Sequence, residues 1–328
     1  MNKSKETRMK AGEGEEQSGA KKKKEKEDVK IDLWNSVEQA RRYIIHGRVE
    51  EANKLVFDTL QGVLSLEIFE DSAIELLPAY FIMAEANVCM GGARLKKAEE
   101  FLIAAYWNLL KHTSDENKTA AEESLVSEQE VSQYRASLHK TFGRLFTSQK
   151  RFEDAIKELA HGIYLDCVEH GPESYKLCSS YYYIGLIFQQ MNKNEEAKSF
   201  YQKIIQIWKR FILERDLKDA EDMQYGREAG EWYSSIDDIY YEEAKDHIKN
   251  MLVFFEVEYG PQHVLTAECE LAFALVMLKT GNVMVSLEFL QKAMYIYINT
   301  LGEYDAKTKE VESLIKRIEA LLRESHEE

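Results

Sequence analysis

The sequence predicts an all-α protein, a solenoid built from repeated helical hairpins. Proline occurs only at positions 78, 172 and 261 of 328 residues, which suits long helices because proline removes a helical donor and clashes with the preceding turn. From Ile31 onward, apolar residues recur every three or four positions, as on one face of a helix. Two parts of the chain also resemble each other at an offset of 42 residues. Together these observations favour helical pairs stacked in series.

The clearest repeat relates residues 138–159 to residues 181–202. Three positions align at the 42-residue offset, namely Gly143 with Gly185, Phe146 with Phe188, and Ala155 with Ala197. In each segment, the small residue of the first helix precedes the alanine of the second helix by twelve positions. Two antiparallel helices approach closely only where both carry a small side chain, so this spacing predicts a tightly packed hairpin.

This order of small residue, aromatic residue, turn and alanine resembles the tetratricopeptide repeat. The resemblance implies a right-handed superhelical solenoid. A period of 42 residues exceeds the usual period of about 34 and is similar to the long-loop repeats of kinesin light chains. Those loops often carry Gly-Pro, as at Gly171–Pro172 and Gly260–Pro261.

The repeat register extends over residues 30–305 and predicts about six hairpins. Their small-residue pairs are Ala40/Ala52, Ala84/Ala98, Gly143/Ala155, Gly185/Ala197, Gly230/Ala244 and Ala274/Ser286. The fifth pair is the weakest match. Residues 306–328 predict a closing amphipathic helix with one apolar face, because an uncapped solenoid would expose its last apolar surface.

Two segments fall outside the repeat. Residues 1–29 are rich in Lys and Glu and are predicted to be a disordered tail; an alternative is that the basic run Lys21–Lys24 tethers the chain to an acidic surface such as a tubulin lattice. An acidic insertion near residues 113–130 interrupts the register after the second hairpin. It is predicted to be disordered or partly helical, with a partner-docking loop as the alternative.

Composition excludes several classes of function. The net charge of −15 argues against nucleic acid as a partner. No apolar run reaches the roughly 18 residues of a membrane span, and no secretory signal is apparent, so a cytosol-continuous compartment is expected. The sequence shows no Gly-rich phosphate loop and no convincing catalytic arrangement, so neither an enzyme nor a cofactor is predicted.

Metal ligands are also sparse in the sequence. The four cysteines lie far apart and form no C-x2-C pair, so buried, reduced thiols are expected rather than a zinc site. His139 and His161 lie on opposite helices of one hairpin and could face each other, but the sequence indicates no third ligand. No metal site is therefore predicted.

The first helices of successive hairpins are expected to line a protein-binding groove. Its candidate residues are Phe81, Glu85, Val88, Lys140, Arg144, Tyr182, Leu186, Leu271 and Leu275. This mixture of apolar and aromatic side chains suits an amphipathic helix or an extended segment of a partner. Lys140 and Arg144 would suit the carboxylate grip of tetratricopeptide co-chaperones. Tyr182 stands where that grip needs an amide, and Glu85 opposes it, so a chaperone tail is not the expected ligand.

Several stretches resemble a narrower family, the zinc finger MYND domain-containing protein 12 group of ciliated cells. They are residues 75–86 (ELLPAYFIMAEA), 97–111 (KAEEFLIAAYWNLLK), 143–166 and 181–211. The resemblance implies a non-enzymatic scaffold of the ciliary or flagellar axoneme, with a cytoplasmic pool before assembly. It implies an accessory subunit that helps hold a single-headed inner-arm dynein on the doublet microtubule.

The same resemblance names the expected partners: an axonemal inner-arm dynein heavy chain, a second tetratricopeptide-repeat protein and doublet microtubule proteins. The sequence contains no MYND zinc finger, so functions of that finger are not expected. The alternative is a soluble cargo or signalling adaptor similar to a kinesin light chain. Residues 1–30 lack the apolar heptad seam through which such light chains assemble, which weighs against this alternative.

Overall fold

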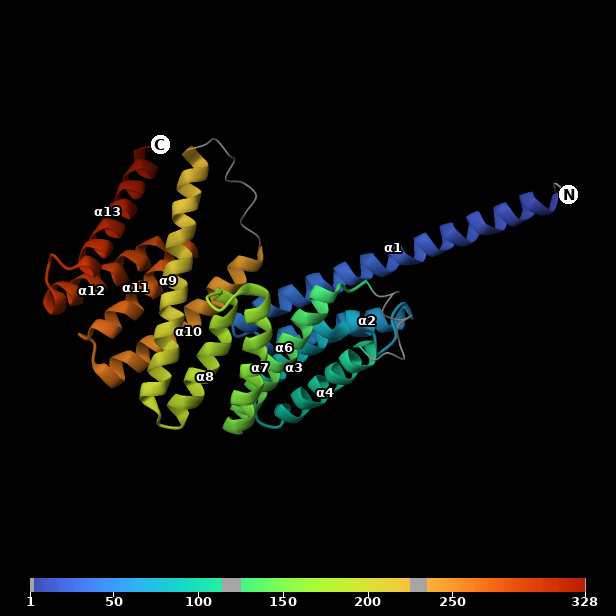
Figure 1. Ribbon diagram of the computed structural model, residues 1–328, viewed down its shortest axis with the longest axis horizontal. Helices are drawn as coiled ribbons and strands as arrows, with labels where there is room; N and C mark the ends of the chain where they lie inside the picture. The colour runs from blue at the N-terminus through green and yellow to red at the C-terminus, as the bar shows by residue number, and fades with distance from the viewer. Residues whose placement is uncertain (1–2, 114–124, 225–234, 328) are drawn as a thin grey trace. The chain divides into compact units, whose positions relative to one another are not determined.

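The computed structural model describes residues 3–113, 125–224 and 235–327, and these are helical with no β-strand among them (Figure 1). The fold is an all-α helical repeat. The chain forms two compact units, Met1–Leu165 and Asp166–Glu328, and each is described by itself. Within the described residues, no helix is both long enough and apolar enough to cross a membrane.

The first unit is a series of three antiparallel helical pairs. α1 packs on α2, α3 packs on α4, and α6 packs on α7. The residues of α7 after Leu165 belong to the second unit. The bounds are α1 Lys3–Ile45, α2 Val49–Ser65, the short 3-10 helix η1 Ile74–Leu76, α3 Leu77–Met90, α4 Arg94–Thr113, α6 Glu128–Ser148 and α7 Phe152–His170.

In the second unit, α8 pairs with α9 and α11 pairs with α12, and α13 packs on α12. The bounds are η3 Tyr175–Leu177, α8 Cys178–Gln190, α9 Asn194–Gln224, α10 Ser235–Tyr259, α11 Val264–Lys279, α12 Val283–Leu301 and α13 Ala306–Glu327. α10 corresponds to the second helix of the fifth predicted hairpin. It contains the buried Ala244 and packs on α8 and α11. The other small residue of this hairpin, Gly230, lies outside the described residues.

Small residues from three of the predicted pairs lie in close contact with the facing helix. A Cβ placed on Gly143 would lie 2.5 Å from Leu159 Cγ, and one on Gly185 would lie 2.9 Å from Tyr201 Cδ1. In the α11–α12 hairpin, Ser286 Oγ donates a hydrogen bond to the Ala274 carbonyl at 2.8 Å. The missing side chains of Gly143 and Gly185 therefore make room for a large buried residue of the facing helix, sixteen positions further along the chain.

In four hairpins, the first helix ends in a turn of the same type. Each closes with a backbone hydrogen bond spanning five residues, from Arg48 to Tyr43, Arg151 to Phe146, Lys193 to Phe188 and Asn282 to Met277, at 2.7–2.9 Å. The residue before each donor has positive φ, between +57° and +77°. This is the Schellman motif, which satisfies carbonyls at a helix C-terminus. In the second hairpin, Gly91 and Gly92 both have positive φ, and this different turn accounts for the fourteen-residue spacing of its alanines.

Two loops that follow second helices share a structure at the 42-residue period. Thr266 Oγ1 donates to the Gly260 carbonyl at 2.8 Å, and Thr308 Oγ1 donates to the Gly302 carbonyl at 2.9 Å. Both glycines have φ near +95° (+95° and +97°). The period found in the helices therefore extends to the loops that join them.

The N-terminal segment differs from its prediction. The composition of residues 1–29 predicts disorder, whereas α1 runs without a break from Lys3 to Ile45. A lack of apolar residues prevents a segment from forming a core, but Lys, Glu, Ala and Met are strong helix formers, and a helix anchored at one end is extended by them at little cost. The packed part of α1 begins near Val29 and includes the buried Leu33, Val37 and Ala40.

The acidic insertion lies mostly outside the described residues, but its end is fixed. Ser127 and Glu130 form a capping box that starts α6. Lys30 of α1 forms an ion pair with Glu130 at 2.9 Å and donates to the Leu125 carbonyl at 2.8 Å. The Leu125 N–H donates to Glu75 Oε1 at 3.0 Å. These bonds tie the start of α6 to α1 and η1.

The closing helix and the cysteines complete the second unit. Val311, Leu314, Ile315 and Ile318 of α13 are buried against the core of this unit. The four cysteines form no disulfide with one another, and Cys178 and Cys269 are buried as expected. Cys89, in the first unit, is exposed, so the expectation of burial is wrong for it.

Substituting Gly185 by alanine is expected to destabilise the protein by about 1–3 kcal/mol, because the new methyl group would press on the buried Tyr201 ring. Gly62 is the matched control: it lies in α2 with open space around it, and Gly62→Ala should stabilise by about 0.5–1 kcal/mol. Urea unfolding of both variants measures the difference. Equal effects at the two glycines would contradict the close-packing account.

Glu270, on α11, gives the stability of the second unit a pH dependence. Its carboxyl is buried, its Oε2 has no hydrogen-bond partner among the described residues, and burial raises its pKa to about 7 despite the nearby Lys292, with Glu256 adding to the rise. Because this pKa lies above the unfolded value of about 4.3, the stabilisation by its neutral form is full below pH ~4.3 and is lost as the pH rises through about 7.

Glu270→Gln should therefore stabilise the protein more at pH 8 than at pH 5, by a difference on the order of 2 kcal/mol. Urea unfolding of the variant and the wild type at both pH values gives the number. A gain or loss that is the same at pH 5 and pH 8 would show that Glu270 does not titrate with folding.

Candidate protein-binding surface

Five of the predicted groove residues lie in the core instead. Phe81, Val88, Tyr182, Leu271 and Leu275 are all buried, the first two in the first unit and the others in the second. Ten of the fourteen residues of α3 and eleven of the sixteen of α11 are buried, and a helix that is apolar on all sides is covered on all sides. The prediction that these residues line a groove is therefore wrong.

The contacts of Tyr182 explain why this aromatic residue of a first helix is buried in the core. Its ring stacks on His247 of α10 with the centroids 3.9 Å apart, and its hydroxyl accepts a hydrogen bond from Asn250 Nδ2 at 3.1 Å. Burial raises the pKa of the Tyr182 hydroxyl. The residue joins α8 to α10, so its role is structural.

The remaining predicted residues are half-buried. Arg144 of α6 forms an ion pair with Glu85 of α3, so its guanidinium already has a carboxylate partner within the first unit. Lys140 lies against Gly162 of α7. Leu186 packs on the core of the second unit. None of these contacts tests whether a partner binds these residues. The roles of Glu85, Lys140, Arg144 and Leu186 in partner binding therefore stay predictions.

The most prominent exposed apolar surface lies on α4. Ile103, Tyr106, Trp107 and Leu110 are 46%, 45%, 64% and 40% exposed. Their spacing of i, i+3, i+4 and i+7 places them on one face of the helix. We call these four residues the α4 stripe. Large apolar side chains in contiguous exposed patches mark interaction sites.

The opposite face of α4 builds the core of the first unit. Ala98, Leu102, Ala105 and Leu109 are buried and pack against α3 and α6. Asn108, also buried, donates from Nδ2 to the Asp71 carbonyl at 3.3 Å. The helix therefore carries two apolar faces, and among the described residues only one of them is buried.

The α4 stripe has a signal in the sequence, although the predicted groove did not include it. Residues 101–110, FLIAAYWNLL, are apolar at nine of ten positions, more than one buried face requires. Exposed large apolar residues on the other described helices occur singly, in pairs or turns apart, such as Val253 and Val257 on α10. A stripe of four on consecutive turns sets α4 apart from them.

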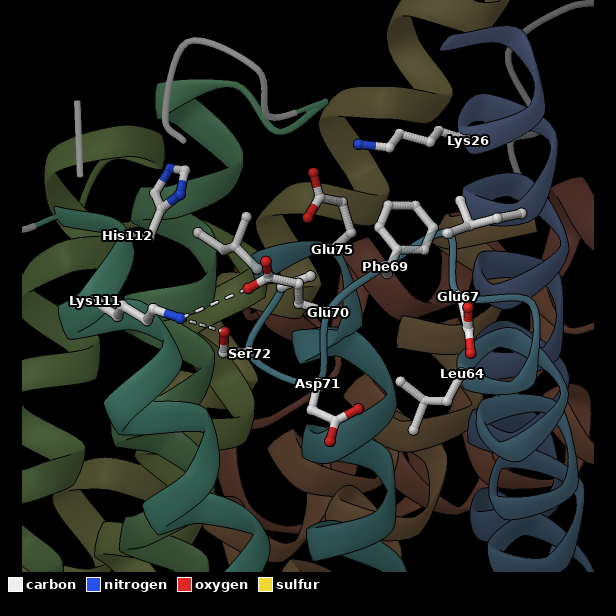
Figure 2. Close-up of a pocket in the computed structure, with 13 residues that line it drawn as sticks. Lys26, Leu64, Glu67, Phe69, Glu70, Asp71, Ser72, Glu75, Lys111 and His112 are labelled. Carbon is white, nitrogen blue, oxygen red and sulfur yellow. Dashed lines mark hydrogen bonds and ion pairs between the residues drawn. The ribbon is translucent and has the colours of Figure 1, made fainter. Parts of the chain in front are cut away.

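A polar hollow lies near the C-terminal end of α4, within the first unit. It has a volume of about 830 Å³ and is lined by Lys26 of α1, by Leu64 and residues 67–75, and by Lys111 and His112. Figure 2 shows the Lys111 ammonium directed at Glu70 and Ser72, with Nζ 3.8 Å from Glu70 Oε2 and 2.7 Å from Ser72 Oγ. These bonds hold the loop before α3 against the end of α4.

The polar residues of the hollow bond to neighbouring parts of the first unit. The hollow's buried carboxylate, Glu75, accepts a hydrogen bond from the Leu125 N–H, and Tyr80 donates from its hydroxyl to the Asp71 carbonyl at 3.1 Å. Mixed acidic and basic side chains line it, and several of them already bond to one another. The bonds of Lys111 to Glu70 and Ser72 therefore hold the loop before α3 near the C-terminal end of the α4 stripe.

A separate group of side chains meets on the third hairpin. His139 of α6 lies beside Glu158 and His161 of α7, with Nδ1 of His139 2.7 Å from Glu158 Oε2. The ligand atoms of the three residues lie within 4.8 Å of one another. The sequence pattern paired the two histidines but gave no sign of Glu158, which could supply the third ligand for a metal.

No known protein-family profile matches the chain. Among solved structures, it is similar to a putative kinesin light chain with nearly identical TPR-like repeats from Podosopora anserina, at 14% identity over 83% of this chain and 97% of that chain, with a TM-score of 0.38. It is also similar to BtubC (BKLC) from P. vanneervenii, at 15% identity over 85% and 93%, with a TM-score of 0.32.

A third similar structure is PilF of Pseudomonas aeruginosa, at 14% identity over 88% of this chain and 98% of that chain, with a TM-score of 0.35. Values of this size carry no information about partners or activity. The class of the protein follows instead from its own geometry: paired antiparallel helices, small residues at each close approach, and a 42-residue period in helices and loops. It is an all-α helical-repeat protein.

The two faces of α4 should differ sharply in their effect on stability. Leu102→Ala is expected to cost about 2–5 kcal/mol because Leu102 is fully buried. Trp107→Ala should change stability by less than about 0.5 kcal/mol because the indole is mostly exposed. Urea unfolding of both variants makes the comparison. A large loss of stability on removing Trp107 would mean that the stripe belongs to the fold.

Proposed function

We propose that this protein is a non-enzymatic scaffold of motile cilia that helps hold a single-headed inner-arm dynein on the axonemal doublet microtubule, and that the α4 stripe binds an amphipathic helix of its partner. The observation that carries the binding part is the exposed run of Ile103, Tyr106, Trp107 and Leu110. The ciliary part rests on the resemblance of residues 75–86, 97–111, 143–166 and 181–211 to the MYND domain-containing protein 12 group.

The α4 stripe has the properties of a helix-binding face. Residues three and four apart on one helix interdigitate with the same pattern on a second helix that crosses it at a shallow angle. Trp and Tyr are the residues that most often dominate binding energy at interfaces. Their rings offer large contact areas with few rotatable bonds, so little entropy is lost when a partner covers them.

Charged residues at one end of the stripe favour a defined orientation of the partner. Lys96, Lys97 and Glu100, in the first two turns of α4, are exposed, while Ile103 to Leu110 form the apolar part that follows. A partner helix with apolar residues at one end and charges at the other would match this order. The stripe also falls inside residues 97–111, one of the segments that carry the family resemblance.

The test is affinity purification from ciliated cells that express the tagged protein. Axonemes are extracted with salt, and inner-arm dynein heavy chains recovered with the protein are quantified by mass spectrometry. We expect the double variant Tyr106→Ala/Trp107→Ala to recover at least about tenfold less dynein than the wild type, because losing an aromatic hot spot costs about 2 kcal/mol or more.

Tyr295→Ala is the matched control, because Tyr295 is an exposed aromatic residue on α12, in the second unit. It should recover dynein like the wild type. Absence of the wild-type protein from the salt-extracted dynein fraction would refute the ciliary part of the proposal. Equal recovery by the stripe variant and the control would refute the binding surface. Recovery of kinesin heavy chain instead of dynein would favour the adaptor alternative.

A further inference from the structure

The α6–α7 hairpin brings two imidazoles and a carboxylate together on the surface of the first unit. Glu158 and His161 are three residues apart on α7 and therefore share one face. His139 projects from the antiparallel α6. Its ring centroid is 5.3 Å from that of His161, and its Nδ1 is 2.7 Å from Glu158 Oε2.

The packing of α6 against α7 determines which side chains of the two helices lie opposite each other. On one side of the cluster, Gly143 leaves room for the buried Leu159. On the other side, Gly162 lies against α6, so that a Cβ there would be 2.9 Å from Lys140 Cγ and 3.3 Å from the Ala136 carbonyl. Two glycines therefore bring the helices close on both sides of His139, which holds its imidazole opposite Glu158 and His161.

We propose that His139, Glu158 and His161 bind a divalent transition-metal ion of the zinc type. Two imidazole nitrogens and one carboxylate oxygen form a ligand set that zinc uses in proteins, with water completing a tetrahedron. Bonds of about 2.0–2.1 Å would place the ligand atoms roughly 3.4 Å apart. The three ligand atoms already lie within 4.8 Å of one another, so rotation of side chains on the surface is enough to close the site.

The ion would join the two helices of the third hairpin. His139 and Glu158 are partly exposed and His161 is exposed, so the ion can enter from solvent and water can occupy the fourth position. A ligand set drawn from both helices binds the folded hairpin but not the unfolded chain. Metal binding therefore stabilises the protein in proportion to its occupancy.

The test uses the full-length protein, without a histidine tag and stripped of metal by a chelator. Isothermal titration with Zn²⁺ measures stoichiometry and affinity, and Co²⁺ absorption reports a four-coordinate nitrogen and oxygen site. The wild type is expected to bind one ion at this site and to melt at a higher temperature with Zn²⁺ than without it. His161→Gln and Glu158→Gln should each weaken binding at least about tenfold and lose most of the thermal shift.

His46→Gln and Glu153→Gln are the matched controls, because both residues are exposed in the same unit and lie outside the cluster. They should bind Zn²⁺ like the wild type. Circular dichroism of each variant establishes that it is folded before titration. Binding that is unchanged in His161→Gln, or equal losses in the cluster variants and the controls, would overturn the proposal. A wild type with no thermal shift and no saturable binding would overturn it as well.

Discussion

The close approach of two helices at a small residue is the contact on which the α6–α7, α8–α9 and α11–α12 hairpins depend. At Gly143 and Gly185, the facing Leu159 and Tyr201 occupy the space that a side chain would fill. In the α11–α12 hairpin, Ser286 donates directly to the Ala274 carbonyl. Because the helices are this close, the large residues on either side of each contact are excluded from water, and the core of each unit is a series of such layers.

The same constraint explains how much of the fold could be predicted from the sequence. Small-residue pairs and turn residues act over short distances, so they are visible in the sequence and place most of the hairpins correctly. The buried faces of α3 and α11 were harder to assign, because Phe81 and Leu271 are covered by neighbouring helices whose packing the sequence does not specify. The helical start of α1 does not follow from the composition of residues 1–29, because a composition that cannot form a core can still favour a helix.

The candidate sites illustrate the same limit. His139 and His161 could be paired from their places in one hairpin, but Glu158 joins them only because Gly143 and Gly162 fix the register of α6 against α7. The α4 stripe could have been anticipated from an excess of apolar residues over what one buried face needs. The ion pair of Arg144 with Glu85 is not visible in the sequence, because the two residues lie on different hairpins.

A repeat protein of this kind acts through the faces that folding leaves unused. In α4, folding uses Leu102 and Leu109 and leaves Tyr106 and Trp107 exposed, so a partner can cover one face without disturbing the other. We propose that this face contacts an inner-arm dynein. Crosslinking mass spectrometry on intact axonemes tests it most directly, through the exposed Lys96 and Lys97 at the start of α4. The account predicts crosslinks from these lysines to a dynein heavy chain. Dynein crosslinks from lysines elsewhere in the chain, with none from Lys96 or Lys97, would contradict it.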